Sequence, residues 1–219
     1  MKLMGKFIVF EGIDGSGKST QIDLLRSKLL SIGQDVHMTT EPTDRSIGKL
    51  IRQILGKEIE ASEETLAALF VADRLDHIQN TQDGMHSKLE NDTHVISDRY
   101  YWSSYAYHGL SMPISKVVEM NDICHQLLKP DLTIYLDLTA EESMKRIEKR
   151  NEKQEKFEKL ELLQGIRQNY FIAFEKYKKD ARIEVVNANQ SIETCAAEIW
   201  ELVSPLFKSA LLKGSTLSS

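Results

Sequence analysis

The sequence predicts an α/β protein with three layers, in which a five-stranded parallel sheet is flanked by helices. Short apolar runs rich in β-forming residues alternate along the chain with longer helical patterns. A glycine-rich loop joins the first apolar run to the first helical pattern, and three of the runs end beside polar residues. Ligands of parallel sheets bind beyond the carboxyl ends of the strands, so these polar residues mark the expected site.

The elements follow in order from the same patterns. Strands are expected over residues 6–10, 35–39, 94–97, 132–136 and 183–186. Helices are expected over residues 19–32, 46–55, 62–79, 83–91, 115–127, 140–149, 158–178 and 192–203, and Pro205 makes a natural stop for the last of them. No repeat or linker divides the chain. We therefore expect one domain over residues 1–212, followed by a flexible tail at 213–219.

The composition narrows the class of protein. The 219 residues are 41% hydrophobic and 28% charged, which is typical of a globular domain. A net charge of -5 is unusual for a protein that coats nucleic acid, and no apolar run approaches the ~20 residues that span a bilayer. We expect neither nucleic acid nor a membrane as partner. Cys124 and Cys195 lie far apart and, with no secretory signal in view, fit a reducing, cytoplasmic location.

Residues 12–19 match the phosphate-binding loop pattern G-x-x-x-x-G-K-[ST]. The expected strand before them and helix after them distinguish a binding site from a glycine-rich structural turn. Lys18 can reach the β- and γ-phosphates of ATP, and the Ser19 hydroxyl can ligate Mg²⁺. The residues expected to surround the ATP phosphates are Gly12, Ile13, Asp14, Gly15, Ser16, Gly17, Lys18, Ser19 and Thr20.

Asp98 and Arg99 follow the apolar run at 94–97. A carboxylate at a strand end near a phosphate-binding loop can hold Mg²⁺ directly or through water, and an adjacent arginine can clamp phosphate oxygens. The alternative interpretation is a surface ion pair, or a helix N-cap by Asp98.

Phe70 and Arg74 lie four residues apart, so on a helix they share a face. A ring and a guanidinium on one face could stack on a planar base and hydrogen-bond to it. Spacing alone favours the ordinary alternative, with Phe70 in the core and Arg74 in solvent. Most rings of the aromatic cluster that follows Arg99 are expected to form wall or core: Tyr100, Tyr101, Trp102, Tyr105 and Tyr107.

Together these segments resemble the thymidylate kinase family of P-loop nucleoside monophosphate kinases. The matching segments are 10–21, 40–43, 47–52, 69–74, 97–100 and 103–107, in family order. Many families share the phosphate loop, but Asp14 within it, combined with Phe-x-x-x-Arg and Asp-Arg-Tyr, is specific. The resemblance implies the three-layer P-loop kinase fold with a short mobile lid. It also implies Mg²⁺-dependent phosphorylation of dTMP to dTDP by ATP, and a homodimer.

The resemblance further implies roles for individual residues. Asp14 looks like the contact to the 3′-hydroxyl side of the acceptor, Arg99 like the clamp on its phosphate, and Asp98 like the group that organises Mg²⁺. Phe70 resembles the ring that stacks on thymine, and Arg74 the guanidinium that meets a base carbonyl.

The remaining implied contacts concern the acceptor. Pro42 shapes the turn beneath it, through a cis bond, and Arg52 contacts its phosphate, with Arg45 as an unranked alternative for that role. Ser104 lies where the family contacts the base, and Tyr107 where a ring crowds a 2′-hydroxyl.

One catalytic cation comes from different places in different members of the family. Some family members carry an arginine at the loop position held here by Gly15, and those that lack it take a cation from the lid. The basic stretch at 145–159 indicates a lid at about 146–158, with Arg150 as first candidate and Arg146 as second. This stretch lacks glycine and is rich in Lys–Glu pairs, so a solvated, salt-bridged helix end is the alternative.

Two other functions compete. A deoxynucleoside kinase needs a carboxylate base near a nucleoside 5′-hydroxyl, and Glu11 is the residue available for it. The other is a non-catalytic nucleotide-binding module, although Lys18, Ser19, Asp98 and Arg99 are all intact.

The histidines are not expected to act in catalysis. His77 and His94 are expected to be structural, because a phosphate acceptor needs no general base.

Overall fold

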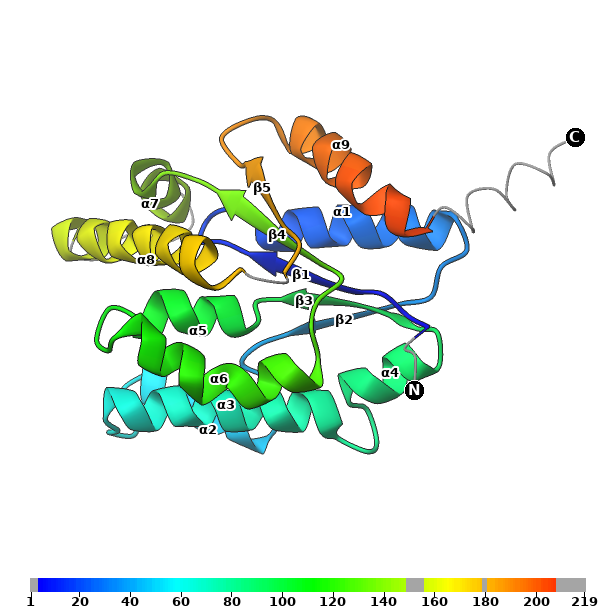
Figure 1. The fold of residues 1–219 in the computed structure, drawn as a ribbon. Coiled ribbons are helices and arrows are strands. Elements are labelled where there is room, and N and C mark those ends of the chain that lie inside the picture. The colour runs from blue at the N-terminus through cyan, green and yellow to red at the C-terminus, as the bar shows by residue number, and fades with distance from the viewer. Residues whose placement is uncertain (1–3, 149–155, 179–180, 208–219) are drawn as a thin grey trace, which may run out of the picture.

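The computed structural model describes residues 4–148, 156–178 and 181–207, and it contains a five-stranded parallel sheet with helices on both faces (Figure 1). The strand order is β2-β3-β1-β4-β5. The strands are β1 (Phe7–Glu11), β2 (Val36–Thr40), β3 (His94–Asp98), β4 (Leu132–Asp137) and β5 (Ile183–Asn187). The predicted fold class is confirmed, and each observed strand lies within one residue of its expected bounds.

Nine α-helices are described within these residue ranges, and the sequence predicted all of them except α5 to within two residues at each end. They are α1 (Lys18–Ser31), α2 (Ser46–Leu55), α3 (Glu63–Gln79), α4 (Met85–Glu90), α5 (Tyr101–His108), α6 (Ile114–Leu127), α7 (Ala140–Glu148), α8 (Lys156–Tyr177) and α9 (Ile192–Val203). A 3₁₀ turn, Ser204–Phe207, follows α9 and contains Pro205. No helix in the described parts of the chain is long and apolar enough to cross a membrane.

The side chains of β1 point alternately to the two faces of the sheet, and on each face they pack into one layer of the core. Ile8 and Phe10 pack with apolar residues of α1 and α9 on one face of the sheet. Phe7 and Val9 pack on the other face with residues of α5, α6 and α8. Because β1 lies between β3 and β4, its carboxyl end opens at the middle of the sheet, where the phosphate loop begins.

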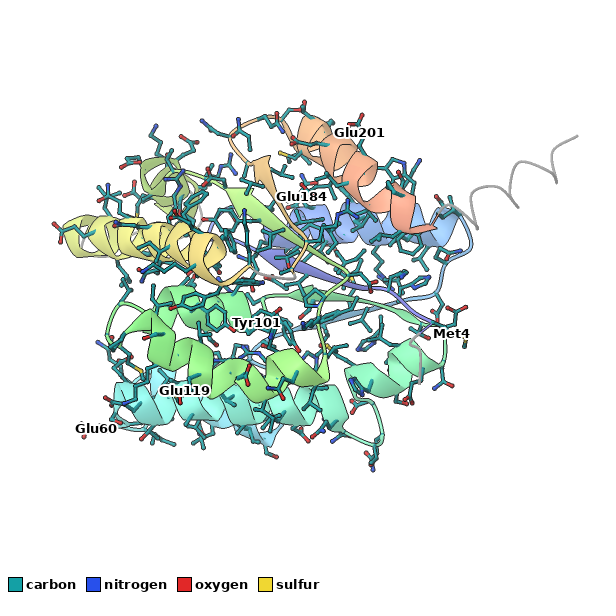
Figure 2. All side chains as sticks on the ribbon, in the orientation of Figure 1. Met4, Glu60, Tyr101, Glu119, Glu184 and Glu201 are labelled. Carbon is teal, nitrogen blue, oxygen red and sulfur yellow. The ribbon has the colours of Figure 1, made fainter. Side chains whose placement is uncertain are left out.

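Helix α5 was not expected, because its sequence is a dense aromatic cluster without a helical apolar period. Its rings nevertheless form core, as the cluster itself predicted: Tyr101 and Trp102 are buried, and their centroids lie 5.4 Å apart. In Figure 2, Tyr101 lies in the interior, whereas Glu60 and Glu201 lie at the periphery. The core on this face of the sheet is therefore rich in aromatic rings.

Candidate active site

Two glycines give the loop between β1 and α1 its backbone conformation. Gly17 is the N-cap residue of α1, and its φ of 95° belongs to the left-handed region that glycine enters most readily. Gly15 has a φ of 76°, and a Cβ there would lie 3.1 Å from the carbonyl oxygen of Ser143 on α7. The loop thus lies against α7, and position 15 has no room for a side chain without movement of that helix.

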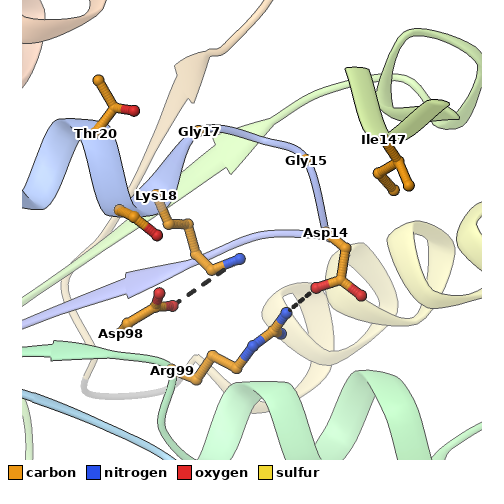
Figure 3. A pocket seen from close by; sticks show the side chains of 9 residues that line it. Asp14, Gly15, Gly17, Lys18, Thr20, Asp98, Arg99 and Ile147 are labelled. Atoms are coloured by element: carbon orange, nitrogen blue, oxygen red, sulfur yellow. Dashed lines mark hydrogen bonds and ion pairs between the residues drawn. The ribbon is translucent and has the colours of Figure 1, made fainter. Parts of the chain in front are cut away.

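Lys18 is buried beneath this loop. Its Nζ donates to the carbonyl oxygen of Gly12 at 3.0 Å and lies 3.9 Å from Oδ1 of Asp98 at the end of β3 (Figure 3). Burial, and then the nearby Arg99 guanidinium, lower the pKa of the Lys18 ammonium to about 8. The Asp98 carboxylate faces this ammonium but lies beyond hydrogen-bond distance, so the lysine can still bind an anionic ligand.

A hollow of about 390 Å³ opens in front of the loop, and Lys18, Asp98, Arg99 and Asp14 meet there (Figure 3). Oδ1 of Asp98 is buried and accepts no hydrogen bond from any described residue. Ser19 lines the same hollow. A carboxylate oxygen and a hydroxyl are oxygen ligands of the kind that Mg²⁺ prefers, so these two residues fit a magnesium site.

Arg99 faces Asp14 across this hollow. Its Nη2 donates to Oδ1 of Asp14 at 2.5 Å, its Nη1 donates to Oγ of Ser103 at 3.2 Å, and its guanidinium lies 4.9 Å from the ring of Tyr107. The backbone of Arg99 has a φ of 75°, which is uncommon outside glycine, and its N–H donates to the carbonyl oxygen of Phe10. Such backbone geometry is kept where surrounding contacts fix it, commonly at ligand sites.

Glu11 is fully buried behind the site rather than among the residues that line the hollow. Its carboxylate accepts hydrogen bonds from Oγ of Ser103 at 2.6 Å, from the hydroxyl of Tyr170 at 2.8 Å and from the backbone N–H of Tyr100 at 2.9 Å. Burial raises its pKa. Glu11 thus fixes Ser103 and the start of α5, and both of its oxygens are already engaged.

Arg74 is 1% exposed, so the alternative that placed it in solvent is wrong. Glu41, which follows β2, binds its Nε at 2.8 Å and its Nη2 at 2.7 Å through one carboxylate oxygen. Ser104 accepts from Nη2 at 3.2 Å. Phe70 lies one turn earlier on α3, partly exposed, with its ring edge-to-face with His108 at 5.2 Å. The structure therefore brings Phe70, Arg74 and Ser104 to one region.

The turn after β2 contains the cis peptide Glu41–Pro42. Arg52 of α2 donates to the carbonyl oxygens of Pro42 at 2.9 Å and Thr43 at 2.6 Å, so it lies directly beside this turn. Arg52 also pairs with one carboxylate, and Arg45 pairs with two. Of the two arginines, Arg52 is the one that contacts the Pro42 turn, so we keep it as the candidate for the acceptor phosphate.

A second cavity, of about 350 Å³, lies on the other side of the loop. It is bounded by the loop, by Arg146 of α7 and by the segment between β5 and α9. Nη2 of Arg146 donates to the carbonyl oxygen of Ala188 at 2.8 Å. Apart from the loop, no motif in the sequence predicted this cavity. Arg150 lies outside the described residues, as do residues 149–155 of the lid expected at 146–158. Residues 146–148 of that expected lid belong to α7, and residues 156–158 belong to α8.

A family model for thymidylate kinase matches residues 10–199 of the chain. The chain belongs to the thymidylate kinase family. A probable thymidylate kinase of Thermococcus gammatolerans is 39% identical over 209 residues, which cover 91% of this chain and 96% of the relative. One from Thermococcus onnurineus is 41% identical over 207 residues, with coverage of 90% and 96%. One from Methanococcus maripaludis is 42% identical over 172 residues, or 77% of each chain.

Several buried partners of these thymidylate kinase motif residues were not predicted from sequence. Glu41 and Asn121 bind Arg74, and Tyr170 of α8 binds Glu11. Glu41 was present in the matching segment at 40–43, so the family pattern could have pointed to it. Asn121 and Tyr170 lie in plain amphipathic helices and carry no local signal. His77 is structural, as expected, with its ring nitrogens facing Glu41 at 3.0 Å and Thr39 at 2.6 Å.

Proposed function

We propose that this protein transfers the γ-phosphoryl group of ATP to the 5′-phosphate of dTMP, giving dTDP and ADP. Membership of the thymidylate kinase family supports this reaction. The observation that carries it is the arrangement of one hollow, where Lys18 and Asp98 lie on one side and the Arg99–Asp14 pair on the other. Two phosphate chains can meet there, each facing its own cation.

On the donor side, the loop amides of residues 12–20 surround the ATP phosphates and Lys18 neutralises the β- and γ-phosphates. The cavity between Arg146 and the β5–α9 segment continues from the loop, and we assign the donor nucleoside to it. A planar base can lie beside the Arg146 guanidinium, which is fixed by Ala188 and flanked by Glu142.

Ser19 and Asp98 are the residues that would hold Mg²⁺. Oδ1 of Asp98 is buried and accepts no hydrogen bond from any described residue, which supports this assignment because its lone pairs are available to a cation. When bound, the ion neutralises charge on the transferred phosphate. Lys18, at 3.9 Å from the same oxygen, keeps the Asp98 carboxylate near the loop.

On the acceptor side, Arg99 and Arg52 offset the repulsion between two anionic nucleotides. Asp14 accepts a hydrogen bond from the sugar, and Pro42 forms the turn beneath the acceptor. Phe70 stacks on thymine, while Arg74 and Ser104, which already hydrogen-bond to each other, meet its polar edge. Tyr107, whose ring lies beside Arg99, restricts the 2′ position.

No general base is needed, because the acceptor phosphate is already ionised near neutral pH. This distinguishes dTMP from a nucleoside, whose hydroxyl must lose a proton. Glu11, the carboxylate that a nucleoside kinase would require, is fully buried with both oxygens occupied. We therefore favour the monophosphate as acceptor.

Arg150 is our assignment for the lid cation, with Arg146 as the second candidate. Gly15 lies against α7, so the loop itself offers no place for an arginine there. Ile147, near the end of α7, lines the hollow, and Arg150 follows it by three residues in the sequence. Arg146 is engaged by Ala188 in the donor cavity.

We also propose a homodimer, with α3 and α6 at the interface, and a cytoplasmic location, where ATP is available. Ile123 of α6 is 52% exposed, which supports the interface. Light scattering of the purified protein tests the dimer, and a monomer at micromolar concentration contradicts it.

The reaction itself is tested by a panel of acceptors with ATP and Mg²⁺. With dTMP as acceptor, we expect dTDP and ADP to form in equal amounts. Thymidine should give no product above background.

A further inference from the structure

Buried groups accept hydrogen bonds from all three nitrogens of the Arg74 guanidinium. An arginine has five N–H donors. Nε and Nη2 both bind Glu41, and Nη2 also donates to Ser104. Nη1 donates to Oδ1 of Asn121 on α6. Among the contacts of the described residues, this leaves a single hydrogen, on Nη1, without an acceptor.

Asn121 is oriented for this contact. It is 1% exposed, and its Nδ2 donates to the carbonyl oxygen of Val117, one turn earlier on α6, at 2.8 Å. In the reversed orientation the amide NH₂ would face the guanidinium, donor against donor. Its Oδ1 would face the Val117 carbonyl, acceptor against acceptor, so both contacts would be unfavourable. The Val117 carbonyl therefore holds the acceptor oxygen of Asn121 towards Arg74.

We propose that Asn121 is a positioning residue that makes the base site selective for a pyrimidine with a carbonyl at position 4. The inference rests on the proposed function, in which Arg74 meets the base. Thymine and uracil carry an oxygen at that position, whereas cytosine carries an amino group. A fixed guanidinium offers only a donor, so the oxygen is matched and the amino group is opposed by another donor.

Selectivity of this kind needs a guanidinium that stays in place. Glu41 fixes the Nε side, but Nη1 is fixed from α6 alone among the contacts described above. Without the Asn121 oxygen, Nη1 has a second free hydrogen and can tilt away from an amino group. The cytosine amino group is then opposed less strongly, and the thymine carbonyl at position 4 is bound less tightly.

Two substitutions separate this role from packing. Asn121→Leu keeps the volume but removes the acceptor. Asn121→Asp keeps an acceptor oxygen for Arg74 but loses the donor to the Val117 carbonyl. Cys124→Ala is the matched control, because Cys124 is buried one turn later on α6 and its Sγ contacts the carbonyl oxygen of Val71 instead. The assay measures kcat and KM for dTMP, dUMP and dCMP at saturating ATP.

For Asn121→Leu we expect KM for dTMP to rise about tenfold, and the preference for dTMP over dCMP in kcat/KM to fall about tenfold. The KM for ATP should stay within about twofold, since ATP makes no contact with Arg74 in the proposed site. Asn121→Asp should show more of the preference than Asn121→Leu, because it still offers an oxygen to Arg74, but less than the native protein, because it cannot donate to the Val117 carbonyl. Cys124→Ala should keep the preference in full.

The outcomes distinguish the two proposals. If the native protein phosphorylates none of the pyrimidine monophosphates, the proposed function and this inference both fall. If the native protein prefers dTMP and Asn121→Leu retains that preference, the role of Asn121 alone is overturned. Equal rises in KM for dTMP, dCMP and ATP also overturn it, because Asn121 would then support the whole site rather than the base contact. Thermal unfolding with and without dTMP gives the same comparison without catalysis.

Discussion

Arg99 and Asp14 form an ion pair of 2.5 Å, although 85 residues separate them in the sequence. The pair joins the end of β3 to the phosphate loop, so two parts of the site are already in register without substrate. An acceptor phosphate competes with Asp14 for the same guanidinium. We expect binding of the acceptor to exchange one anionic partner of Arg99 for another and to release Asp14 towards the sugar.

The pKa of Lys18 predicts how donor affinity depends on pH. In the free protein this pKa is about 8, and bound phosphates raise it by supplying negative charge. Above pH 8 the free protein has lost the proton that the complex needs, so binding takes up a proton. Affinity for a non-hydrolysable ATP analogue should then fall by up to about tenfold per pH unit. Calorimetric titration at pH 7.5, 8.5 and 9.5 measures it.

Lys18→Ala provides the control for that titration. Its affinity should be weak and nearly independent of pH over the same interval, and its turnover should be about a hundredfold lower or worse. Native affinity that stays constant up to pH 9.5 contradicts the assignment of Lys18 to the phosphates.

Phe70 should contribute to acceptor binding and hardly at all to ATP binding. Phe70→Ala removes the ring that we place on thymine, and we expect a loss of about 1–3 kcal/mol in dTMP affinity. Phe171→Ala is the matched control, since Phe171 is a partly exposed ring on α8 that contacts Tyr135 and Arg167. Separate titrations of dTMP and an ATP analogue measure both effects, and equal losses for the two ligands rule out a base-side role.

Arg150 and Arg146 should differ in which step they affect. Arg150→Ala should slow the chemical step more than it weakens ground-state binding, because a lid cation meets charge that develops during transfer. Arg146→Ala should mainly weaken the donor, because Arg146 lines the donor cavity. Single-turnover rates at saturating substrates decide between them. An unchanged rate in Arg150→Ala removes that residue from the mechanism.

The fold was predictable because its signals are local. Glycine at positions 15 and 17, with an apolar run before and a helical period after, specified the strand, loop and helix that the structure contains. Helix α5 was missed because four of the seven residues from Tyr101 to Tyr107 are aromatic and their spacing shows no helical apolar period.

The site was predictable only in part. The motifs indicated Arg74 and Phe70, but spacing alone placed Arg74 in solvent. Its burial depends on Glu41 and Asn121, which lie 33 and 47 residues away. The Arg74 guanidinium can be buried only because the fold brings Glu41 and Asn121 to it. A local sequence pattern cannot predict a contact between residues so far apart in the chain.

His108 should make stability fall in mild acid. Burial, and then the Arg74 charge, lower its pKa from the ordinary 6.5 to about 4 in the folded protein. Above pH 6.5 the ring is neutral in both states and stability is complete. As the pH falls below 6.5 the unfolded chain takes up a proton that the fold rejects, and the loss ends near pH 4. By pH 5 it should reach about 2 kcal/mol.

Urea unfolding at pH 7.5 and pH 5 tests this expectation. His108→Gln should reduce the difference in unfolding free energy between the two pH values by about that same 2 kcal/mol. The difference measured for the native protein includes other groups, among them His94 and His37, whose pKa values are also lowered by burial. A variant with the full native difference contradicts the assignment to His108.

The most direct measurement of the central claim gives the purified protein ATP and Mg²⁺ with dTMP or thymidine, and follows both products by chromatography. If Lys18 and Arg99 hold a donor and an acceptor phosphate in one hollow, dTDP and ADP form together from dTMP, and thymidine is left unchanged. Absence of dTDP above background, or faster phosphorylation of thymidine than of dTMP, contradicts the account.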